Sequence, residues 1–292
     1  IRSAARCPGT KPQPRMILAQ TSVWAFLYPK YTRYRHKISI DVDEFCKIVD
    51  VTTRTWRVLC SKRKNHRYTH SMNLFLDTAN TECWALLAKT GLFTGITTNP
   101  LLLERSGLNT SIETYHELYT KALDLGYPSI QFQVFGSDWL QCAQAIQAIG
   151  PEVVIKIPAN ETGFSVAAQL ELPKRITLTA VYSEGQVMAA EALGVAYTAP
   201  YYARLKDAVD NADALFDRMQ DIAFETELLV ASLRSVDQLF DLASRGFFTF
   251  ALPQPIATEF FKSSLADQAI NAFEEAAQRE PKIVTTSSRV GG

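Results

Sequence analysis

Histidine is scarce in this sequence, and its scarcity argues against two common classes of enzyme. Only four of the 292 residues are histidines, and His116 is the only one after Met72. It lies in a segment with helical periodicity, so no ligand set for zinc is visible, and a Ser-His-Asp hydrolytic triad fails for the same reason. The five cysteines are scattered without CxxC spacing, which indicates a reducing compartment and no structural zinc.

Long apolar runs and an excess of one charge are missing as well. The sequence contains no run of about 18 apolar residues, the length that indicates a transmembrane helix. Its content of 47% hydrophobic and 21% charged residues is typical of a soluble globular protein. The formal net charge is zero but unevenly distributed, because residues 1–71 hold 15 Lys and Arg against 4 Asp and Glu.

Residues 1–71 show no sustained periodicity, and we expect them to form a poorly structured or non-native basic extension outside the fold. A targeting presequence is one interpretation, because such peptides are basic and poor in acids. A leader from an expression vector or a gene model is favoured, because the chain lacks an initiator Met and Met72 directly precedes a strand-like run. A nucleic-acid-binding arm and an ordered extra element are the alternatives. Because a leader is the favoured interpretation, we expect no nucleic-acid partner. We expect a cytoplasmic protein, or an organellar one if the presequence is genuine.

From Met72 onward, short strand-like runs alternate with helical segments, the pattern of a parallel sheet covered by helices. Helical periodicity is clear in residues 114–126, 139–150 and 183–194. The eight strand candidates are residues 73–77, 94–99, 129–134, 152–158, 175–182, 195–201, 227–232 and 247–253. Eight such units predict an α/β fold, a (β/α)₈ TIM barrel over residues 72–280, followed by a tail at 281–292. A doubly wound sheet is disfavoured because no GxGxxG follows the first strand.

Lys156 is the residue on which the functional prediction depends. If the odd-numbered residues of the strand EVVIKIP (152–158) face the helices, Val154 and Lys156 face the barrel interior. Burial favours the neutral amine and lowers the pKa of a lysine, as a nucleophilic lysine requires. A structural lysine paired with a carboxylate is the commoner case for a lone strand lysine. The residues around Lys156 therefore decide between a structural and a nucleophilic lysine.

Polar residues occupy the carboxyl ends of most predicted strands, where barrel enzymes carry their active sites. Each alone has an ordinary explanation as a helix cap, a turn residue or a β-propensity choice. Gathered around one inward lysine they indicate a site, because every buried polar group needs a partner. They are Asp77, Thr97, Asn99, Gln131, Gln133, Thr177, Thr179, Tyr201 and Ser232. Without metal or triad, carbonyl chemistry through an amine remains.

Six sequence blocks resemble the transaldolase family, and most closely its small fructose-6-phosphate aldolase branch. In chain order they are LDTAN (76–80), GITTNPLLL (95–103), VVIKIPA (153–159), TLTAVYS (177–183), APYYAR (199–204) and ASLR (231–234). The TTNP and IKIP blocks are together specific, and the resemblance extends over residues 72–275. It implies a class I aldolase whose lysine forms a covalent imine with a sugar phosphate, without a metal or other cofactor.

The resemblance also implies roles for the residues at the bond that breaks. Lys156 matches the Schiff-base lysine, and Asp77 matches the acid/base near the C3–C4 bond. Asn99 matches a hydrogen-bonding partner of the dihydroxyacetone moiety, and Thr97 helps to line that pocket. An iminium on Lys156 would withdraw electrons while a base removes the C4 hydroxyl proton.

Two further groups of residues are implied by the same resemblance. The residues that match the holders of the catalytic water are Gln133, Thr179 and Tyr201. The residues that match the phosphate binders are Ser232 and Arg204, with Arg234 as a further cation. Arginine's planar fork suits a phosphate.

Two positions bear on the subclass. Transaldolases proper place a glutamate at the position of Gln133 and a phenylalanine at that of Tyr201, so this pair is similar to the aldolase branch. After Arg204, however, the glycine-rich segment of that branch is replaced by LKDAVDNAD (205–213). The asparagine that precedes the arginine in that branch is replaced by Ala203. We therefore expect the loop over the sixth strand and the mode of phosphate binding to differ from those of the aldolase branch.

Three functions are compatible with these residues. Aldol cleavage or synthesis at C3–C4 of fructose 6-phosphate, a lyase reaction, is favoured. Transfer of dihydroxyacetone between sugar phosphates, the transaldolase reaction of the pentose phosphate pathway, is the alternative, and a non-catalytic sugar-phosphate-binding barrel is the third. We also expect a homo-oligomer, with the amphipathic stretch 258–278 across a neighbouring subunit or, alternatively, closing its own barrel.

Overall fold

The computed structural model describes residues 71–279, so the predicted basic extension up to residue 70 and the predicted tail lie outside the described residues. Eight parallel strands close into a barrel in chain order, which confirms the (β/α)₈ prediction. They are β1 (Asn73–Asp77), β2 (Gly95–Thr97), β3 (Ile130–Gln133), β4 (Val153–Pro158), β5 (Ile176–Val181), β6 (Tyr197–Pro200), β7 (Glu227–Val230) and β8 (Thr249–Pro253).

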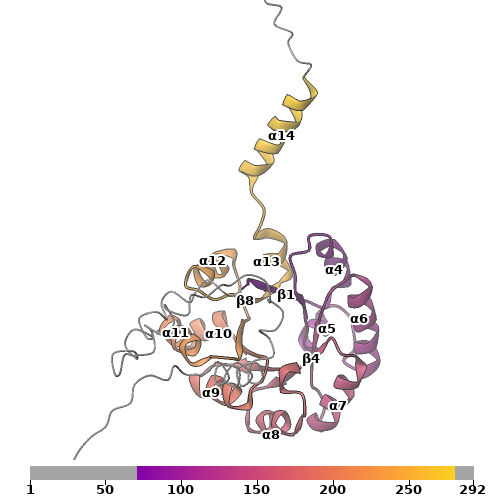
Figure 1. Ribbon diagram of the computed structural model, residues 1–292, viewed down its shortest axis with the longest axis vertical. Helices are drawn as coiled ribbons and strands as arrows, with labels where there is room; N and C mark the ends of the chain where they lie inside the picture. Colours follow the sequence, from indigo (N-terminus) through magenta and orange to yellow (C-terminus); the bar gives the residue numbers. More distant parts are fainter. Residues whose placement is uncertain (1–70, 280–292) are drawn as a thin grey trace, which may run out of the picture. The chain divides into compact units, whose positions relative to one another are not determined.

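Helices follow one another around the strands, as the sequence of colours from α4 to α12 shows in Figure 1. Two α-helices follow each of β2, β6 and β8. The helices are α4 (Thr81–Ala88), α5 (Pro100–Arg105), α6 (Ile112–Asp124), α7 (Trp139–Ile149), α8 (Glu161–Gln169), the 3₁₀ helix η4 (Pro173–Arg175), α9 (Glu184–Leu193), α10 (Tyr202–Ala208), α11 (Ala212–Ile222), α12 (Val236–Ser244), α13 (Gln254–Glu259) and α14 (Ser264–Gln278).

Local sequence explains where these helices begin and end. The predicted helix at 183–194 is α9, which opens with a capping box between Ser183 and Gln186. It ends at Gly194, whose φ of 64° lies in the left-handed region that glycine adopts without steric cost. Asn80, Asn99 and other short polar residues likewise cap the helices that follow the strands.

The strands separate two apolar regions. The larger lies between strands and helices and includes Val153, Ile155 and Ile157 from β4. The smaller fills the barrel interior and consists of Phe75, Ala199, Leu229, Ala231 and Ala251, with Tyr197 and Tyr201 packed against them. The predicted alternation along β4 is therefore confirmed, and Lys156 faces inward.

Close packing fixes the strand that carries Lys156. Lys156 pairs in register with Gln133 of β3 and Thr177 of β5. Behind it, α8 lies so close to the end of β4 that a Cβ added to Gly163 would be 1.8 Å from the Pro158 carbonyl oxygen. Any larger residue at position 163 would push α8 away from the strand.

The last helix, α14, has an amphipathic sequence, but none of its residues is buried. Leu265, Ile270 and Phe273 are all exposed. The structure therefore gives no support to packing of α14 against its own barrel. Phe260, at the start of the predicted stretch 258–278, does pack against the barrel core and contacts the ring of Phe93. No helix in residues 71–279 is long and apolar enough to cross a membrane.

Candidate active site

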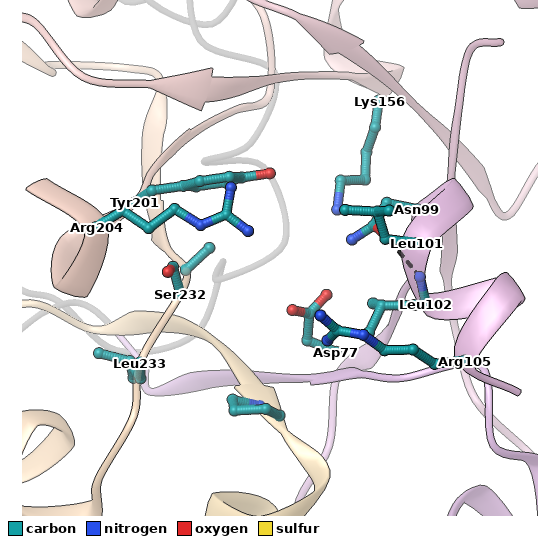
Figure 2. Close-up of a pocket in the computed structure, with 12 residues that line it drawn as sticks. Asp77, Asn99, Leu101, Leu102, Arg105, Lys156, Tyr201, Arg204, Ser232 and Leu233 are labelled. Carbon is teal, nitrogen blue, oxygen red and sulfur yellow. Dashed lines mark hydrogen bonds between the residues drawn. The ribbon is translucent and has the colours of Figure 1, made fainter.

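A cavity of about 180 Å³ opens at the carboxyl ends of the strands and gathers six of the ten predicted site residues. They are Lys156, Asp77, Asn99, Tyr201, Arg204 and Ser232. Figure 2 shows them converging from different strands and from the helices that follow, as expected for a barrel enzyme. A larger neighbouring cavity shares Asp77, Leu102, Arg105 and Pro253 with it.

Lys156 is buried, with 5% of its surface exposed. Its amine has no hydrogen-bond or salt-bridge partner among residues 71–279. Burial lowers the pKa of Lys156 below the ordinary lysine value, and the negative charge of Asp77 opposes this only in part. A larger neutral fraction than in an ordinary lysine is therefore present near neutral pH, and a neutral amine is the form that attacks a carbonyl.

Asp77 ends β1 and faces the same cavity as Lys156. The fully buried hydroxyl of Thr97, from the adjacent strand β2, donates a 2.7 Å hydrogen bond to its Oδ1. The strand register places the two residues directly opposite each other. The carboxylate is thus held in one orientation while it remains exposed to the cavity, as a general base requires.

Tyr201 follows β6 and forms the opposite wall. Its hydroxyl lies 3.1 Å from the Thr179 hydroxyl, within hydrogen-bonding distance, and the guanidinium of Arg204 lies 5.0 Å from its ring centroid. Burial raises the pKa of Tyr201, although the hydrogen bond with Thr179 opposes this. The phenol is therefore protonated at neutral pH, and with Thr179 it presents a pair of hydroxyl groups beside the cavity.

Two non-glycine residues near the site have left-handed backbone conformations. Ser232, which lines the cavity, has a φ of 61°, and Ala180, which follows Thr179, has a φ of 57°. The pairing register of β5 with β6 shifts at Ala180, from Thr179 to Val181. Such conformations cost roughly 1–3 kcal/mol each and cluster at functional sites. Here they set the directions of the side chains at the ends of β5 and β7.

Asn99 has a double position, as helix cap and as cavity residue. Its Oδ1 accepts a 3.1 Å hydrogen bond from the Leu102 backbone N–H, which caps α5, and Pro100 occupies the first turn of that helix. Its side-chain amide group is left to face the cavity. Asn99 is therefore both a helix cap and a cavity residue, and not a turn residue alone.

Three of the remaining predicted residues lie next to the cavity residues without lining the cavity. Thr97 bonds Asp77 and Thr179 bonds Tyr201, while Gln133 is the partner of Lys156 on the neighbouring strand. Deeper in the barrel, Thr177 donates a 2.9 Å hydrogen bond to Gln131 Oε1, and the Nε2 of Gln131 has no partner among residues 71–279.

Arg234 lies apart from the other predicted residues and lines neither cavity. Its guanidinium forms two hydrogen bonds to the carboxylate of Asp207, at 3.0 and 2.5 Å. Both side chains are more than half exposed. In this structure the guanidinium is therefore turned to Asp207 and not to the cavity.

The sequence prediction did not include six residues of the cavity wall. Ala231, Leu233 and Pro253 lie at or beyond the ends of β7 and β8, and the other three are Leu101, Leu102 and Arg105. These last three lie on α5, whose cap Asn99 places the start of the helix directly at the mouth of the barrel. Residues three and four positions apart share one helix face, so Arg105 lies beside Leu101 and Leu102. The Asn-Pro start of α5 is the signal that could have identified them.

Among residues 71–279, no three or more His, Cys, Asp or Glu side chains are grouped so that they could hold a metal ion. The two cysteines in this range, Cys83 and Cys142, are unpaired.

Comparison with known proteins places this chain in a family. The family model described as "Transaldolase/Fructose-6-phosphate aldolase" matches residues 74–290. A "Probable transaldolase" of Coprothermobacter proteolyticus is 30% identical over 212 residues, which cover 69% of this chain and 94% of that protein. A "Probable transaldolase" of Caulobacter sp. strain K31 is 31% identical with the same coverage, and one of Aquifex aeolicus is 27% identical over 72% of this chain and 99% of its own length.

A solved structure supports the fold alone. The crystal structure of a HpcH/Hpal aldolase/citrate lyase family protein from Burkholderia cenocepacia J2315 superimposes with a TM-score of 0.50 at 11% identity. The match covers 74% of this chain and 99% of that chain. At this identity the likeness concerns the barrel and not its chemistry.

Proposed function

This chain belongs to the transaldolase/fructose-6-phosphate aldolase family, and we propose that it is a class I aldolase that cleaves and forms the C3–C4 bond of fructose 6-phosphate. The observation that carries the proposal is the buried amine of Lys156, with its lowered pKa, in one small cavity with the carboxylate of Asp77. A sugar phosphate is the substrate class of this family.

The first step is formation of an imine. The neutral amine of Lys156 adds to the C2 carbonyl of the ketose, and the resulting carbinolamine loses water to give a protonated imine. Asn99, which lines the same cavity, can hydrogen-bond the hydroxyls of the C1–C3 fragment through its side-chain amide. No metal is needed in this scheme, because the protonated imine itself withdraws electrons from C3.

The second step breaks the carbon–carbon bond. The carboxylate of Asp77 accepts the proton of the C4 hydroxyl, the C3–C4 electron pair moves into the iminium, and an aldehyde leaves. An enamine of dihydroxyacetone remains on Lys156. The hydrogen bond from Thr97 holds the carboxylate in place for this transfer, and a guanidinium such as Arg204 can bind the phosphate of the departing aldehyde.

The fate of the enamine distinguishes the two candidate reactions. In an aldolase, the enamine is protonated at C3 and water then hydrolyses the imine to free dihydroxyacetone. The protonated hydroxyl of Tyr201, paired with Thr179, favours this course because it can orient that water. In a transaldolase the enamine adds to a second aldehyde, and the names of the relatives favour this alternative.

The proposed function is tested by following cleavage of fructose 6-phosphate. The full chain should release glyceraldehyde 3-phosphate in a coupled assay, and Lys156→Ala should abolish the release. The matched control is Lys89→Ala, because Lys89 is an exposed lysine at the end of α4. Wild-type protein that is folded but inactive with and without an acceptor aldehyde would favour the third candidate, a non-catalytic barrel.

A second assay separates aldolase from transaldolase. Free dihydroxyacetone is measured with and without erythrose 4-phosphate. We expect release of dihydroxyacetone in the absence of the acceptor. Turnover that requires erythrose 4-phosphate, with transfer of the three-carbon unit to it, would identify the transferase. A homo-oligomeric state, a cytoplasmic location and the absence of a cofactor remain proposals of the same kind, for which size measurement, localisation and metal analysis are the tests.

A further inference from the structure

Two arginines lie on opposite walls of the cavity that Lys156 and Asp77 line. Arg204 is in α10, which follows β6, whereas Arg105 ends α5, which follows β2. Figure 2 shows Tyr201, Arg204 and Ser232 on one side and the α5 residues on the other, with Asp77 between them. The cavity measures about 180 Å³, so a single small substrate would meet both walls.

Arg234, which the resemblance implied as an additional phosphate-binding cation, is paired with a carboxylate outside the cavity. Asp207 holds its guanidinium through two hydrogen bonds. Asp207 belongs to LKDAVDNAD (205–213), the segment that replaces the glycine-rich segment of the aldolase branch. The departure from the family pattern therefore supplies the carboxylate that pairs with Arg234.

Arg105, in contrast, has no such partner. Within residues 71–279 no salt bridge or hydrogen bond engages its side chain. It lines both the cavity of Lys156 and the larger cavity beside it. In Figure 2 its guanidinium points into the pocket on the side of Asp77. A fork of five unpaired donors at this place is suited to an anion that arrives with the substrate.

We propose that Arg105 is the second anion-binding residue of this pocket, and that with Arg204 it clamps the phosphate of the aldehyde half of the substrate across Asp77. The proposal rests on the proposed function, since it concerns how that reaction's substrate is held. It assigns to Arg105 the part that the sequence suggested for Arg234.

Charge balance explains why a second cation is needed. A phosphate monoester carries a charge of about −1.5 to −2 at neutral pH, and the carboxylate of Asp77 lies in the same cavity. With the amine neutral, Arg204 alone would only offset Asp77. Arg105 makes the formal charge of the lining +1, so that a phosphorylated aldehyde is attracted instead of repelled. The clamp thus confers a preference for phosphorylated over unphosphorylated aldehydes.

The test measures this preference in the full chain. Dihydroxyacetone is condensed with glyceraldehyde 3-phosphate or with glyceraldehyde, and the ratio of the two kcat/KM values is determined. Arg105→Ala should lower this ratio by roughly tenfold to a hundredfold, the loss expected for a charge-assisted hydrogen bond. Arg105→Lys should keep part of it, because lysine retains the charge without the fork. The surface control Arg218→Ala, which removes an exposed ion pair with Glu184, should leave the ratio unchanged.

Two results would overturn the proposal. The first is an unchanged ratio in Arg105→Ala, which includes equal losses of kcat/KM with both aldehydes, and such losses would mean that Arg105 only positions Asp77. The second is a larger loss of the ratio in Arg234→Ala than in Arg105→Ala. Failure of the proposed function is recognised separately. Wild-type protein is first treated with dihydroxyacetone and borohydride, and the absence of a lysine adduct would mean that the imine chemistry itself fails.

Discussion

The hydroxyl of Thr97 donates a 2.7 Å hydrogen bond to Oδ1 of Asp77, and in residues 71–279 no other side chain bonds that carboxylate. The proposed base is therefore oriented from one side by a buried residue that does not line the cavity. A hydrogen bond to a charged group contributes more than one between neutral groups. Thr97 is thus expected to act on the reaction through Asp77.

Thr97→Val should lower kcat for aldol cleavage by roughly tenfold to a hundredfold, because the substitution keeps the shape of the side chain and removes the hydrogen bond. Steady-state kinetics with fructose 6-phosphate measure the loss, and KM should change little. Thr98→Val is the matched control, because the neighbouring buried hydroxyl bonds the Gln131 carbonyl oxygen and not Asp77. An equal loss of kcat in both variants would show that the effect is only structural.

Lys156→Met should raise the free energy of unfolding at pH 7, by an amount on the order of 1 kcal/mol. The folded-state pKa of Lys156 is lowered, so its protonation opposes folding. This penalty is complete below the folded-state pKa and declines as the pH rises toward 10.5, the ordinary lysine value. The gain from Lys156→Met should therefore shrink between pH 7 and pH 10.

Urea unfolding at the two pH values measures this gain. The exposed Lys89→Met provides the control and should show no comparable gain. A gain for Lys156→Met that increases with pH would contradict the account, since it would mean that the folded state prefers the ammonium form.

Tyr201→Phe should slow release of dihydroxyacetone more than it slows carbon–carbon cleavage. The substitution removes the hydroxyl that pairs with Thr179, and the raised pKa of Tyr201 means that this hydroxyl carries its proton at neutral pH. Rapid-quench measurement should show a burst of glyceraldehyde 3-phosphate followed by a steady state roughly tenfold slower than in wild type. Equal slowing of the burst and the steady state would mean that Tyr201 has no specific part in the hydrolytic step.

Ala180→Gly should leave the free energy of unfolding unchanged or raise it by up to about 1 kcal/mol, because the φ of 57° at Ala180 is a conformation that glycine adopts without steric cost. Thermal and urea unfolding measure the effect. The control is Ala189→Gly in the middle of α9, which should lose about 1 kcal/mol through lower helix propensity. Losses of the same size at both positions would contradict the strain at Ala180.

Much of the barrel could be predicted from the sequence, because each strand is a short apolar run whose inward and outward positions alternate. The odd-numbered residues of β4 enter the outer core and Lys156 faces inward, as that alternation requires. Some predicted strands extend beyond the observed strands. Ala231, for example, lies beyond β7 and forms only an isolated bridge with Tyr201.

The candidate site was harder to predict from the sequence where it depends on contacts between side chains far apart in the chain. The pairing of Arg234 with Asp207 spans 27 residues, and nothing in the spacing of the two indicates it. Arg105 is missed because its position depends on where α5 begins, which the cap at Asn99 decides. The left-handed conformations of Ala180 and Ser232 carry no sequence signal, since neither residue type favours that region.

Borohydride trapping followed by peptide mass spectrometry tests directly whether Lys156 forms an imine with the substrate. The full chain is incubated with dihydroxyacetone or fructose 6-phosphate, reduced and digested, and the modified peptide is sequenced. We expect a single reduced adduct on Lys156 that is absent in Lys156→Ala and present in Lys89→Ala. No adduct in a folded protein, or an adduct on another lysine that persists in Lys156→Ala, would contradict it.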